Sequence, residues 1–383
     1  MDLKDIRKGI DSIDDQIADL YIKRMELVDE VGKYKAEHNI GTENTLRERE
    51  ILTRVTDKMP DDIKLYGKEV YTAMFDTSKA YQWRRVGVTS PVRQKIEEQI
   101  LEGIKPFQTN AKVDCQGIHG AYSSIAADKV FPLAKTMFFK DFDGVFQAVE
   151  KGFCDFGVLP IENSSVGSVT KVYDLMREHK FYIVRAIKMH IKHCLLAKKG
   201  TKLEDIKEVY SHEQALNQCE GFLKDLKDVK YTVVSNTAVA AKLVAESDRK
   251  DVACVCSKEC AGIYDLVNLK SNIQDNDQNF TRFIVICKDL KIFEDNNKIS
   301  LMCNLPHESG SLNKTLNKFS TLGLNLTKLE SRPLLNSTFE FSFYFDIEAK
   351  VTMKEVLNLI GELDSSNKEF VFLGSYKEIW NTD

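Results

Sequence analysis

Residues 155–168 read DFGVLPIENSSVGS, an apolar run that passes directly into a polar turn. The apolar part is typical of a short buried strand, and the polar residues open a helix whose apolar positions begin at Val172. A turn of this composition exposes backbone N–H groups and hydroxyls, which suits an anionic ligand. Similar apolar runs, such as residues 181–184, alternate with helical stretches such as residues 142–151. From about Lys112 onward we therefore expect an α/β domain.

The N-terminal segment has a different pattern, with no proline between residues 2 and 38. Apolar residues recur there at spacings of three and four, which predicts one long amphipathic helix: Leu3, Ile6, Ile10, Ile13, Ile17 and Leu20. At about 1.5 Å per residue this helix would be roughly 50 Å long, too long for one compact neighbour to cover. It requires partner helices, which a second chain could supply. Helical patterns resume at residues 45–58 and 63–83.

Near Lys298 the pattern changes again, to strand, helix, strand, strand, helix, strand. This order predicts a ferredoxin-like βαββαβ unit. The expected strands are residues 299–305, 324–330, 338–348 and 370–376, with helices at 311–322 and 353–363. The expected organisation is multidomain: an all-helical domain at 1–85, a connector at 86–110, an α/β domain at 111–290 and the βαββαβ unit at 298–378.

The bulk composition argues against several classes of protein. The 54 basic and 58 acidic residues are well mixed, so no basic surface for nucleic acid or an anionic membrane is expected. No apolar run reaches the roughly 18–20 residues that span a bilayer, and residues 1–5 lack signal-peptide features, so we expect a cytoplasmic protein. The nine cysteines are expected to be reduced and buried, because Cys254, Cys256 and Cys260 have no further metal ligands near them in sequence. We expect neither a metal nor a cofactor.

Cationic and neutral polar side chains share faces of the predicted N-terminal helices. Arg24 and Lys35 are eleven residues apart and, at about 100° per residue, return to one face within roughly 20°. Arg7 is turned about 100° from that face, so it could meet the same ligand only from a neighbouring copy. Ser78 and Gln82 are i and i+4 and share a face of the third helix. Any one of these residues alone is better explained as part of a solvated helical face.

Together, these positions resemble the all-helical chorismate mutase family over residues 3–85. The matching residues are Arg7, Arg24, Lys35, Arg47, Glu48, Ser78 and Gln82. The resemblance implies an intertwined dimer in which Arg7 acts across the interface. It also implies that Asn44 stands where some members carry Asp, with altered affinity for chorismate rather than lost activity.

The chemistry explains these residue types. The rearrangement of chorismate is pericyclic, so catalysis reduces to holding one conformer and stabilising separated charge. By the resemblance, Arg7 and Arg24 would hold the two carboxylates with help from Ser78. Lys35 and Gln82 would donate to the ether oxygen. Glu48 would accept from the ring hydroxyl.

The middle segment resembles prephenate dehydratase over residues 112–288. The matching motifs are Gly117-x-x-Gly120-x-x-Ser123, Glu162-Asn163-Ser164, Ser211-His212 with Gln218-Cys219, Thr237-Ala238 and Thr281-Arg282-Phe283. The resemblance implies a two-lobed α/β fold like that of periplasmic binding proteins, with prephenate in the cleft. Thr281 would serve the leaving hydroxyl, while Asn163 and Gln218 would orient the substrate. Glu162, Ser164, Ser211 and His212 would lie near it, with His212 favoured as a structural cap.

The last segment resembles the amino-acid-binding ACT domain of phenylalanine-controlled dehydratases over residues 298–378. The matching stretches are Gly310-Ser311-Leu312 and Glu330-Ser331-Arg332-Pro333. The resemblance implies L-phenylalanine held between paired domains, with Asn325 and Leu326 also near it.

The leading hypothesis is therefore a bifunctional chorismate mutase and prephenate dehydratase that L-phenylalanine inhibits, working as a homodimer or a dimer of dimers. Two alternatives stay open. In the first, the helical segment only dimerises an otherwise active dehydratase. In the second, the chain is an amino-acid sensor without catalysis.

Overall fold

The computed structural model describes residues 2–38, 40, 44–86, 90–308, 310–334, 341–367 and 369–381. The chain divides into two compact units. The first consists of Met1–Glu98 and Leu301–Phe372, and the second of Gln99–Ser300 and Leu373–Asp383. Both units are therefore discontinuous in sequence.

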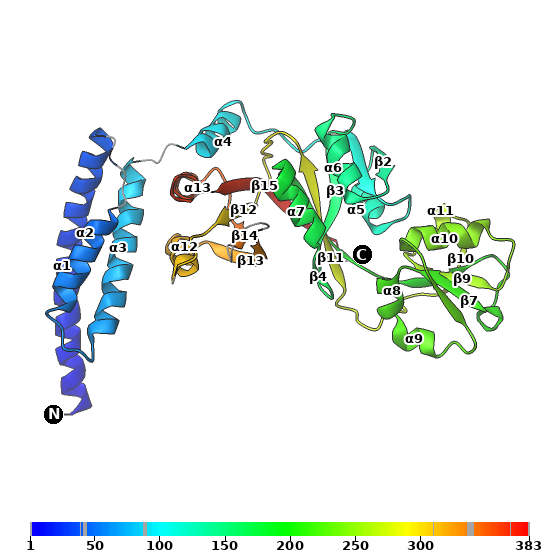
Figure 1. The fold of residues 1–383 in the computed structure, drawn as a ribbon, viewed down its shortest axis with the longest axis horizontal. Coiled ribbons are helices and arrows are strands. Elements are labelled where there is room, and N and C mark those ends of the chain that lie inside the picture. Colours follow the sequence, from blue (N-terminus) through cyan, green and yellow to red (C-terminus); the bar gives the residue numbers. More distant parts are fainter. Residues whose placement is uncertain are drawn as a thin grey trace. The chain divides into compact units, whose positions relative to one another are not determined.

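The N-terminal part is all-helical, as its apolar spacing predicts. It contains α1 (Leu3–Glu37), α2 (Thr45–Thr56) and α3 (Lys64–Val86). Asp2 caps the first of these, because its Oδ1 accepts from the backbone N of Asp5 at 2.8 Å. Figure 1 shows α1 as one unbroken helix with α3 alongside it, and α2 in turn packs against α3.

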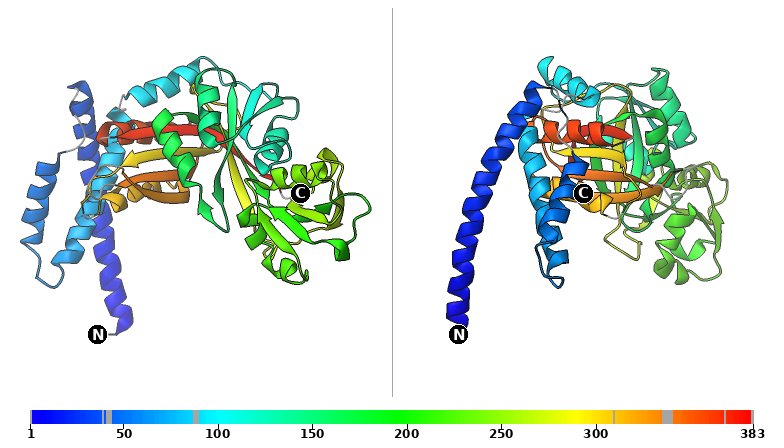
Figure 2. Two further views of the ribbon diagram at one scale, coloured as in Figure 1. Left: turned by 45° about the vertical axis from the view of Figure 1, so that its right-hand side comes forward. Right: turned by 60° about the vertical axis from the view of Figure 1, so that its left-hand side comes forward.

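Much of the apolar stripe of α1 is exposed in the single chain. Ile10, Ile13 and Ile17 are 52%, 57% and 57% exposed. The N-terminal turns of α1 extend beyond α2 and α3 (Figure 2). An exposed apolar stripe of this length is unfavourable in water and is a candidate interaction surface.

A mixed sheet forms the core of the second unit. Its strands lie in the order β15-β5-β11-β3-β1-β2. Their bounds are β1 Lys112–Gln116, β2 Lys135–Phe139, β3 Phe156–Asn163, β5 Tyr182–His190, β11 Phe280–Cys287 and β15 Phe370–Asn381, with the short β4 (Gly167–Ser168) paired to β3. The associated helices are α5 (Tyr122–Val130), α6 (Phe142–Glu150) and α7 (Thr170–His179). The polar turn at residues 164–166 thus joins two paired strands, and the helix begins after β4.

A second sheet forms the other lobe of this unit, in the order β10-β6-β9-β7-β8. Its strands are β6 Cys194–Ala197, β7 Glu208–Ser211, β8 Lys230–Val233, β9 Val252–Cys256 and β10 Val267–Lys270. Helices α8 (Glu213–Asn217), α9 (Glu220–Lys224), α10 (Thr237–Glu246) and α11 (Cys260–Ile263) accompany it, with α10 and α9 on opposite faces of the sheet (Figure 1). Alternate residues of β9 therefore serve two cores, with Cys254 in the α10 core and Val255 in the α8–α9 core.

The C-terminal segment has the predicted βαββαβ order. Its elements are β12 (Lys298–Asn304), α12 (Ser311–Thr321), β13 (Asn325–Pro333), β14 (Phe341–Glu348), α13 (Lys354–Ser366) and β15. Residues 338–340 of the expected third strand lie outside the described ranges. The last strand is longer than predicted, because residues 377–381 continue it and pair in parallel with residues 185–189 of β5.

Three further predictions can be compared with the described residues. The expected connector at 86–110 contains a helix, α4 (Pro91–Leu101). All nine cysteines are buried with free thiols, as their use as small core residues predicts. Among the described helices, none is long and apolar enough to cross a membrane.

Candidate active sites

Arg24 of α1 meets Ser78 of α3. The Arg24 Nη1 donates to Ser78 Oγ at 2.5 Å and to the Met74 carbonyl at 3.5 Å. Gln82 lies one turn further along α3 against Gly32, where an added Cβ would come within 3.5 Å of the Gln82 Cγ. The Gln82 Oε1 is buried with no hydrogen-bond partner among the described residues. The facing surfaces of α1 and α3 thus bring together a cation, a hydroxyl and an unsatisfied amide.

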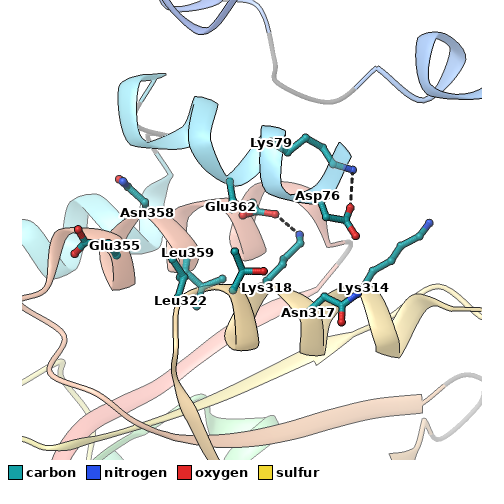
Figure 3. Close-up of a pocket in the computed structure, with 12 residues that line it drawn as sticks. Asp76, Lys79, Lys314, Asn317, Lys318, Leu322, Glu355, Asn358, Leu359 and Glu362 are labelled. Carbon is teal, nitrogen blue, oxygen red and sulfur yellow. Dashed lines mark ion pairs between the residues drawn. The ribbon is translucent and has the colours of Figure 1, made fainter. Parts of the chain in front are cut away.

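Glu48 of α2 is held by a cation that the sequence analysis missed. Its Oε1 lies 3.2 Å from the Lys79 Nζ. The same Nζ lies 3.2 Å from the Asp76 Oδ1, and Figure 3 shows this second pair. Burial lowers the pKa of Lys35, and the charge of the nearby Glu48 carboxylate opposes that shift. Glu48 is therefore close enough to interact with cations from both neighbouring helices. In the sequence, the only signal for Lys79 is that it directly follows the predicted site residue Ser78.

Lys79 and Asp76 also line a pocket of about 100 Å³ beside α12 and α13. Lys318 and Glu362 form an ion pair in its wall (Figure 3). None of the predicted mutase residues lines this pocket.

Three predicted mutase residues lie apart from this cluster. Arg7 precedes Arg24 by 17 positions, roughly 25 Å along one helix, so one chain cannot bring both to one small ligand. The Asn44 side chain caps α2, its Oδ1 accepting from the Arg47 backbone N at 3.0 Å. The Arg47 side chain is 61% exposed and pairs with Glu50 at 3.0 Å. In the single chain, Arg47 is therefore a surface residue and not part of the cluster.

Thr281 and Asn163 lie opposite each other on the paired strands β11 and β3. The Asn163 Nδ2 donates to Thr281 Oγ1 at 2.8 Å and to Asn279 Oδ1 at 2.9 Å. The Asn163 Oδ1 accepts from the backbone N of Ser165 and of Val166 at 3.0 and 3.1 Å. All the hydrogen-bonding capacity of this amide is used inside the protein. The described contacts of Asn163 hold the Thr281 hydroxyl, and the expectation that Asn163 orients the substrate stays a prediction.

Polar contacts continue from Asn279 toward the second lobe. The Asn279 Nδ2 donates to Gln218 Oε1 at 3.1 Å, and the same oxygen lies 3.0 Å from the His193 Nε2. The His193 Nδ1 lies 3.2 Å from the Tyr122 hydroxyl. Burial lowers the pKa of His193, although the hydrogen bond with Gln218 opposes this. The Gln218 Nε2 is buried and has no partner among the described residues, so it is an unsatisfied donor.

The structure therefore brings together three predicted dehydratase residues, Thr281, Asn163 and Gln218, by way of Asn279. Sequence reasoning missed the roles of Asn279, His193 and Tyr122. Tyr122 lies inside the glycine motif at residues 117–123 and Asn279 lies two residues before Thr281, so both carried a local signal. His193 carried none, because its position depends on folding between distant segments.

Four other predicted residues have structural contacts. Ser211 is fully buried and donates to the Val255 carbonyl at 2.6 Å, so its hydroxyl proton is used inside the protein, and its place near the substrate stays a prediction. The His212 Nδ1 accepts from the Gln214 backbone N at 3.2 Å, the cap that was favoured for it. Ser164 donates to the Gln278 carbonyl at 2.7 Å and accepts from the Phe280 N at 2.9 Å, which fixes the turn before Thr281. Glu162 lies opposite Arg282 in the strand pairing.

A cavity of about 430 Å³ lies beside Tyr122. Its lining includes Lys129, Lys192 and Lys258 but not Thr281 or Gln218. The cavity therefore borders the polar contacts of the site through Tyr122, while Thr281 and Gln218 lie outside its lining.

The predicted effector residues lie at two places in the C-terminal segment. Gly310 precedes α12 with a φ of 85°, and Ser311 and Leu312 begin the helix. Asn325 begins β13 and donates to Glu348 Oε2 at 2.6 Å. The other predicted residues follow on β13, an edge strand that pairs only with β14 in the described part of the chain: Leu326, Glu330, Ser331, Arg332 and Pro333. An edge strand is a place where a further strand can pair.

Comparisons with known proteins assign a family to each of the two parts of the chain that hold these clusters. The family model for chorismate mutase type II matches residues 6–83, and the one for prephenate dehydratase matches residues 113–291. The chain is 32% identical to the bifunctional chorismate mutase/prephenate dehydratase of Aquifex aeolicus, over 98% of each chain. It is also 36% identical to arogenate dehydratase 2 of Petunia hybrida, over 77% of this chain and 79% of that one.

A solved dehydratase structure is similar to about two thirds of the chain. The prephenate dehydratase of Arthrobacter aurescens in complex with L-Phe superposes with a TM-score of 0.63 at 28% identity, covering 69% of this chain and 89% of that one. Full-length similarity to a two-activity enzyme, together with matches to both families at the two clusters, assigns the whole chain. It belongs to the family of bifunctional chorismate mutase/prephenate dehydratases.

Proposed function

We propose that the chain rearranges chorismate to prephenate in its helical part and converts prephenate to phenylpyruvate in its α/β part, under inhibition by L-phenylalanine. The observation that carries the dehydratase assignment is the Asn163–Thr281 hydrogen bond. Because Thr281 Oγ1 accepts from an amide, its own O–H is free to donate elsewhere.

In the dehydratase reaction, prephenate loses its ring hydroxyl and its ring carboxylate as the ring becomes aromatic. Electrons from the breaking C–CO2 bond enter the ring, and the C–O bond breaks to release hydroxide, which then takes a proton from solvent. A hydrogen bond from Thr281 stabilises the charge that grows on the departing oxygen. The free Gln218 Nε2 donates to the substrate. Neutral donors suit this step, because a tight cation on the departing carboxylate would stabilise the ground state more than the transition state.

In the mutase reaction, no proton moves. Arg24 and the partner's copy of the Arg7 position would hold the two carboxylates, with Ser78 fixing the Arg24 guanidinium. Lys35 and Gln82 would donate to the ether oxygen, where negative charge grows as the bond breaks. Glu48, held by Lys79, would accept from the ring hydroxyl.

The C-terminal βαββαβ segment would act as an ACT domain that binds L-phenylalanine. Its order of elements supports this assignment, as does the exposed edge strand β13. The proposed domains are a helical mutase domain at residues 1–85, a connector at 86–110, a dehydratase domain at 111–290 and the ACT domain at 298–378. The exposed stripe of α1 supports a homodimer through the helical domain, and pairing of β13 between dimers would give a dimer of dimers. The protein would act in the cytoplasm and without a cofactor.

The test is a coupled assay on the full chain. Chorismate should yield phenylpyruvate, and L-phenylalanine should lower the rate. Lys35→Ala should abolish chorismate consumption while leaving prephenate turnover intact. Lys33→Ala is the matched control, because Lys33 is exposed on α1 and pairs only locally with Asp29 and Glu30. An unchanged rate in Lys35→Ala would reduce the helical part to a dimerisation module, and no turnover of prephenate by the unaltered chain would refute the dehydratase assignment.

Arogenate should be assayed beside prephenate, because the Petunia relative is named for it. In arogenate an amino group replaces the side-chain keto group, so the ring chemistry at Thr281 is the same. A higher kcat/KM with arogenate than with prephenate would make arogenate the preferred substrate, and the proposed roles of the site residues would stay the same.

A further inference from the structure

A buried cluster of charges lies directly behind the dehydratase site. The Glu378 side chain is 6% exposed, yet three cations surround it. Its Oε1 lies 2.6 Å from Arg282 Nε, and its Oε2 lies 2.7 Å from Lys298 Nζ and 3.4 Å from Lys188 Nζ. The Arg282 Nη2 also donates to the Tyr376 hydroxyl at 2.7 Å. Removing these charges from water costs free energy, and only their mutual ion pairs and hydrogen bonds offset that cost. The side chains are therefore confined to one arrangement.

The cluster reaches Thr281 through one peptide bond. Thr281 and Arg282 are consecutive on β11, so their side chains lie on opposite faces of the sheet. Thr281 contacts Asn163 on one face, and Arg282 contacts Glu378 on the other. A movement of Glu378 that shifts the Arg282 backbone therefore also displaces the neighbouring Thr281 hydroxyl.

Two partners of Arg282, Tyr376 and Glu378, lie on β15 of the C-terminal βαββαβ segment. Lys298, which pairs with Glu378, begins β12 of the same segment. Tyr376 is fully buried, and its hydroxyl lies 2.6 Å from Ser300 Oγ, which joins the two strands. Gly374 of β15 has a φ of 138°, and a Cβ there would overlap the backbone of Ile183 on β5. The end of β15 is thus seated against the sheet that carries the site.

We propose that Glu378 is a positioning residue for Thr281, and that the Arg282–Glu378 pair transmits the state of the C-terminal segment to the dehydratase site. The inference rests on the function proposed above and adds a route to it. A shift of β15 or β12 along its length moves the carboxylate or Lys298. Arg282 follows, since separating it from Glu378 would break the shortest ion pair of a buried cluster. The Thr281 hydroxyl then leaves the geometry that the leaving oxygen needs.

The experiment uses the full chain with Glu378→Gln and Tyr376→Phe. The matched control is Glu208→Gln, which removes a buried strand carboxylate paired with Arg249 and Lys230 in the other lobe. For each protein, kcat and KM are measured with prephenate, along with the L-phenylalanine concentration that halves the rate. L-Phenylalanine binding is measured by calorimetry. Chorismate consumption by the same samples reports whether the rest of the chain is intact.

The expected result is a fall in prephenate kcat of about 10-fold to 100-fold in Glu378→Gln, with a small change in KM. Inhibition should also separate from binding: the ratio of the half-inhibiting concentration to the dissociation constant should rise by about 5-fold or more. Tyr376→Phe should change both quantities in the same direction by less. Glu208→Gln should leave both near those of the unaltered chain.

Unchanged kcat and unchanged inhibition in both variants would overturn the proposal. So would a parallel loss of chorismate and prephenate turnover, which a purely structural role predicts. If Glu378→Gln does not fold, Tyr376→Phe decides the matter, because it removes one oxygen atom only. A chain that turns over prephenate but shows no such effects refutes the coupling alone, whereas an unaltered chain inactive on prephenate refutes the proposed function.

Discussion

The Asn163 Nδ2 donates to Thr281 Oγ1 at 2.8 Å, across the pairing of β3 with β11. The direction of this bond decides what Thr281 can do. An amide NH2 only donates, so the Thr281 oxygen accepts and its proton points elsewhere. Asn163 is itself fixed by two backbone N–H groups. The Asn163–Thr281 pair therefore holds the Thr281 hydroxyl in place as a hydrogen-bond donor, and no titratable group is needed to orient it.

Thr281→Val should remove that donor while keeping the shape of the side chain. We expect prephenate turnover to fall by about 10²-fold to 10⁴-fold, the usual range for a lost acid or hydrogen-bond donor in the transition state. Thr281→Ser should keep most of the rate, because it keeps the hydroxyl. The measurement is phenylpyruvate formation, with chorismate consumption as the control that should not change.

Asn163→Asp tests the direction of the hydrogen bond. A carboxylate can only accept, so Thr281 would turn its proton toward residue 163 and away from the substrate. Prephenate turnover should fall by about 100-fold, as for other losses of one preorganised donor. A variant with the normal rate would show that the Asn163 amide does not set the orientation of Thr281.

Local sequence pattern predicted the elements but only part of the sites. The apolar spacing of α1 and the runs of β3 and β11 depend on neighbouring residues, so they could be read directly. The roles of hydroxyls and amides depend on burial and on distant partners. Ser211 and Thr281 are both hydroxyl residues at the ends of strands, yet the Ser211 hydroxyl donates its proton to the Val255 carbonyl. His193 entered no motif because its contact with Gln218 joins segments 25 residues apart.

Arg7 and Arg24 provide a test of the dimer. Each single variant, Arg7→Ala or Arg24→Ala, should lose chorismate mutase activity. In a mixed dimer of the two, one site carries both substitutions and the other carries neither. Co-refolded mixtures should therefore recover about a quarter of the normal activity, because half the dimers are mixed and one site in two is intact. No recovery would show that Arg7 does not act across an interface.

Lys35 predicts the pH dependence of the mutase. Its ammonium must be protonated to donate to the ether oxygen, and burial lowers its pKa while Glu48 opposes that shift. Activity should thus fall with rising pH as Lys35 loses its proton. Glu48→Gln removes the opposing charge, so the alkaline limb of kcat/KM for chorismate should move to still lower pH. Glu50→Gln is the control, since Glu50 pairs with the exposed Arg47. A limb that stays in place in Glu48→Gln would mean that another group sets it.

Asp114 on β1 predicts how the stability of the α/β unit depends on pH. The side chain is fully buried, and burial raises its pKa to about 8, although the Cys154 thiol opposes this. In the unfolded chain the carboxyl ionises near its usual value, so the folded state binds one more proton between those two pKa values. The contribution of Asp114 to the unfolding free energy is most favourable at low pH, and it falls as the pH rises toward 8.

Replacing Asp114 with Asn removes the ionisation, so the gain in unfolding free energy of Asp114→Asn should be larger at pH 8 than at pH 5 by about 3 kcal/mol. Urea unfolding of the full chain at the two pH values measures this difference, with the exposed Asp225→Asn as a control that should change by less than about 0.5 kcal/mol. An equal effect of Asp114→Asn at both pH values would show that Asp114 is ionised in the folded protein, and its burial would then need a cation partner that the described residues do not supply.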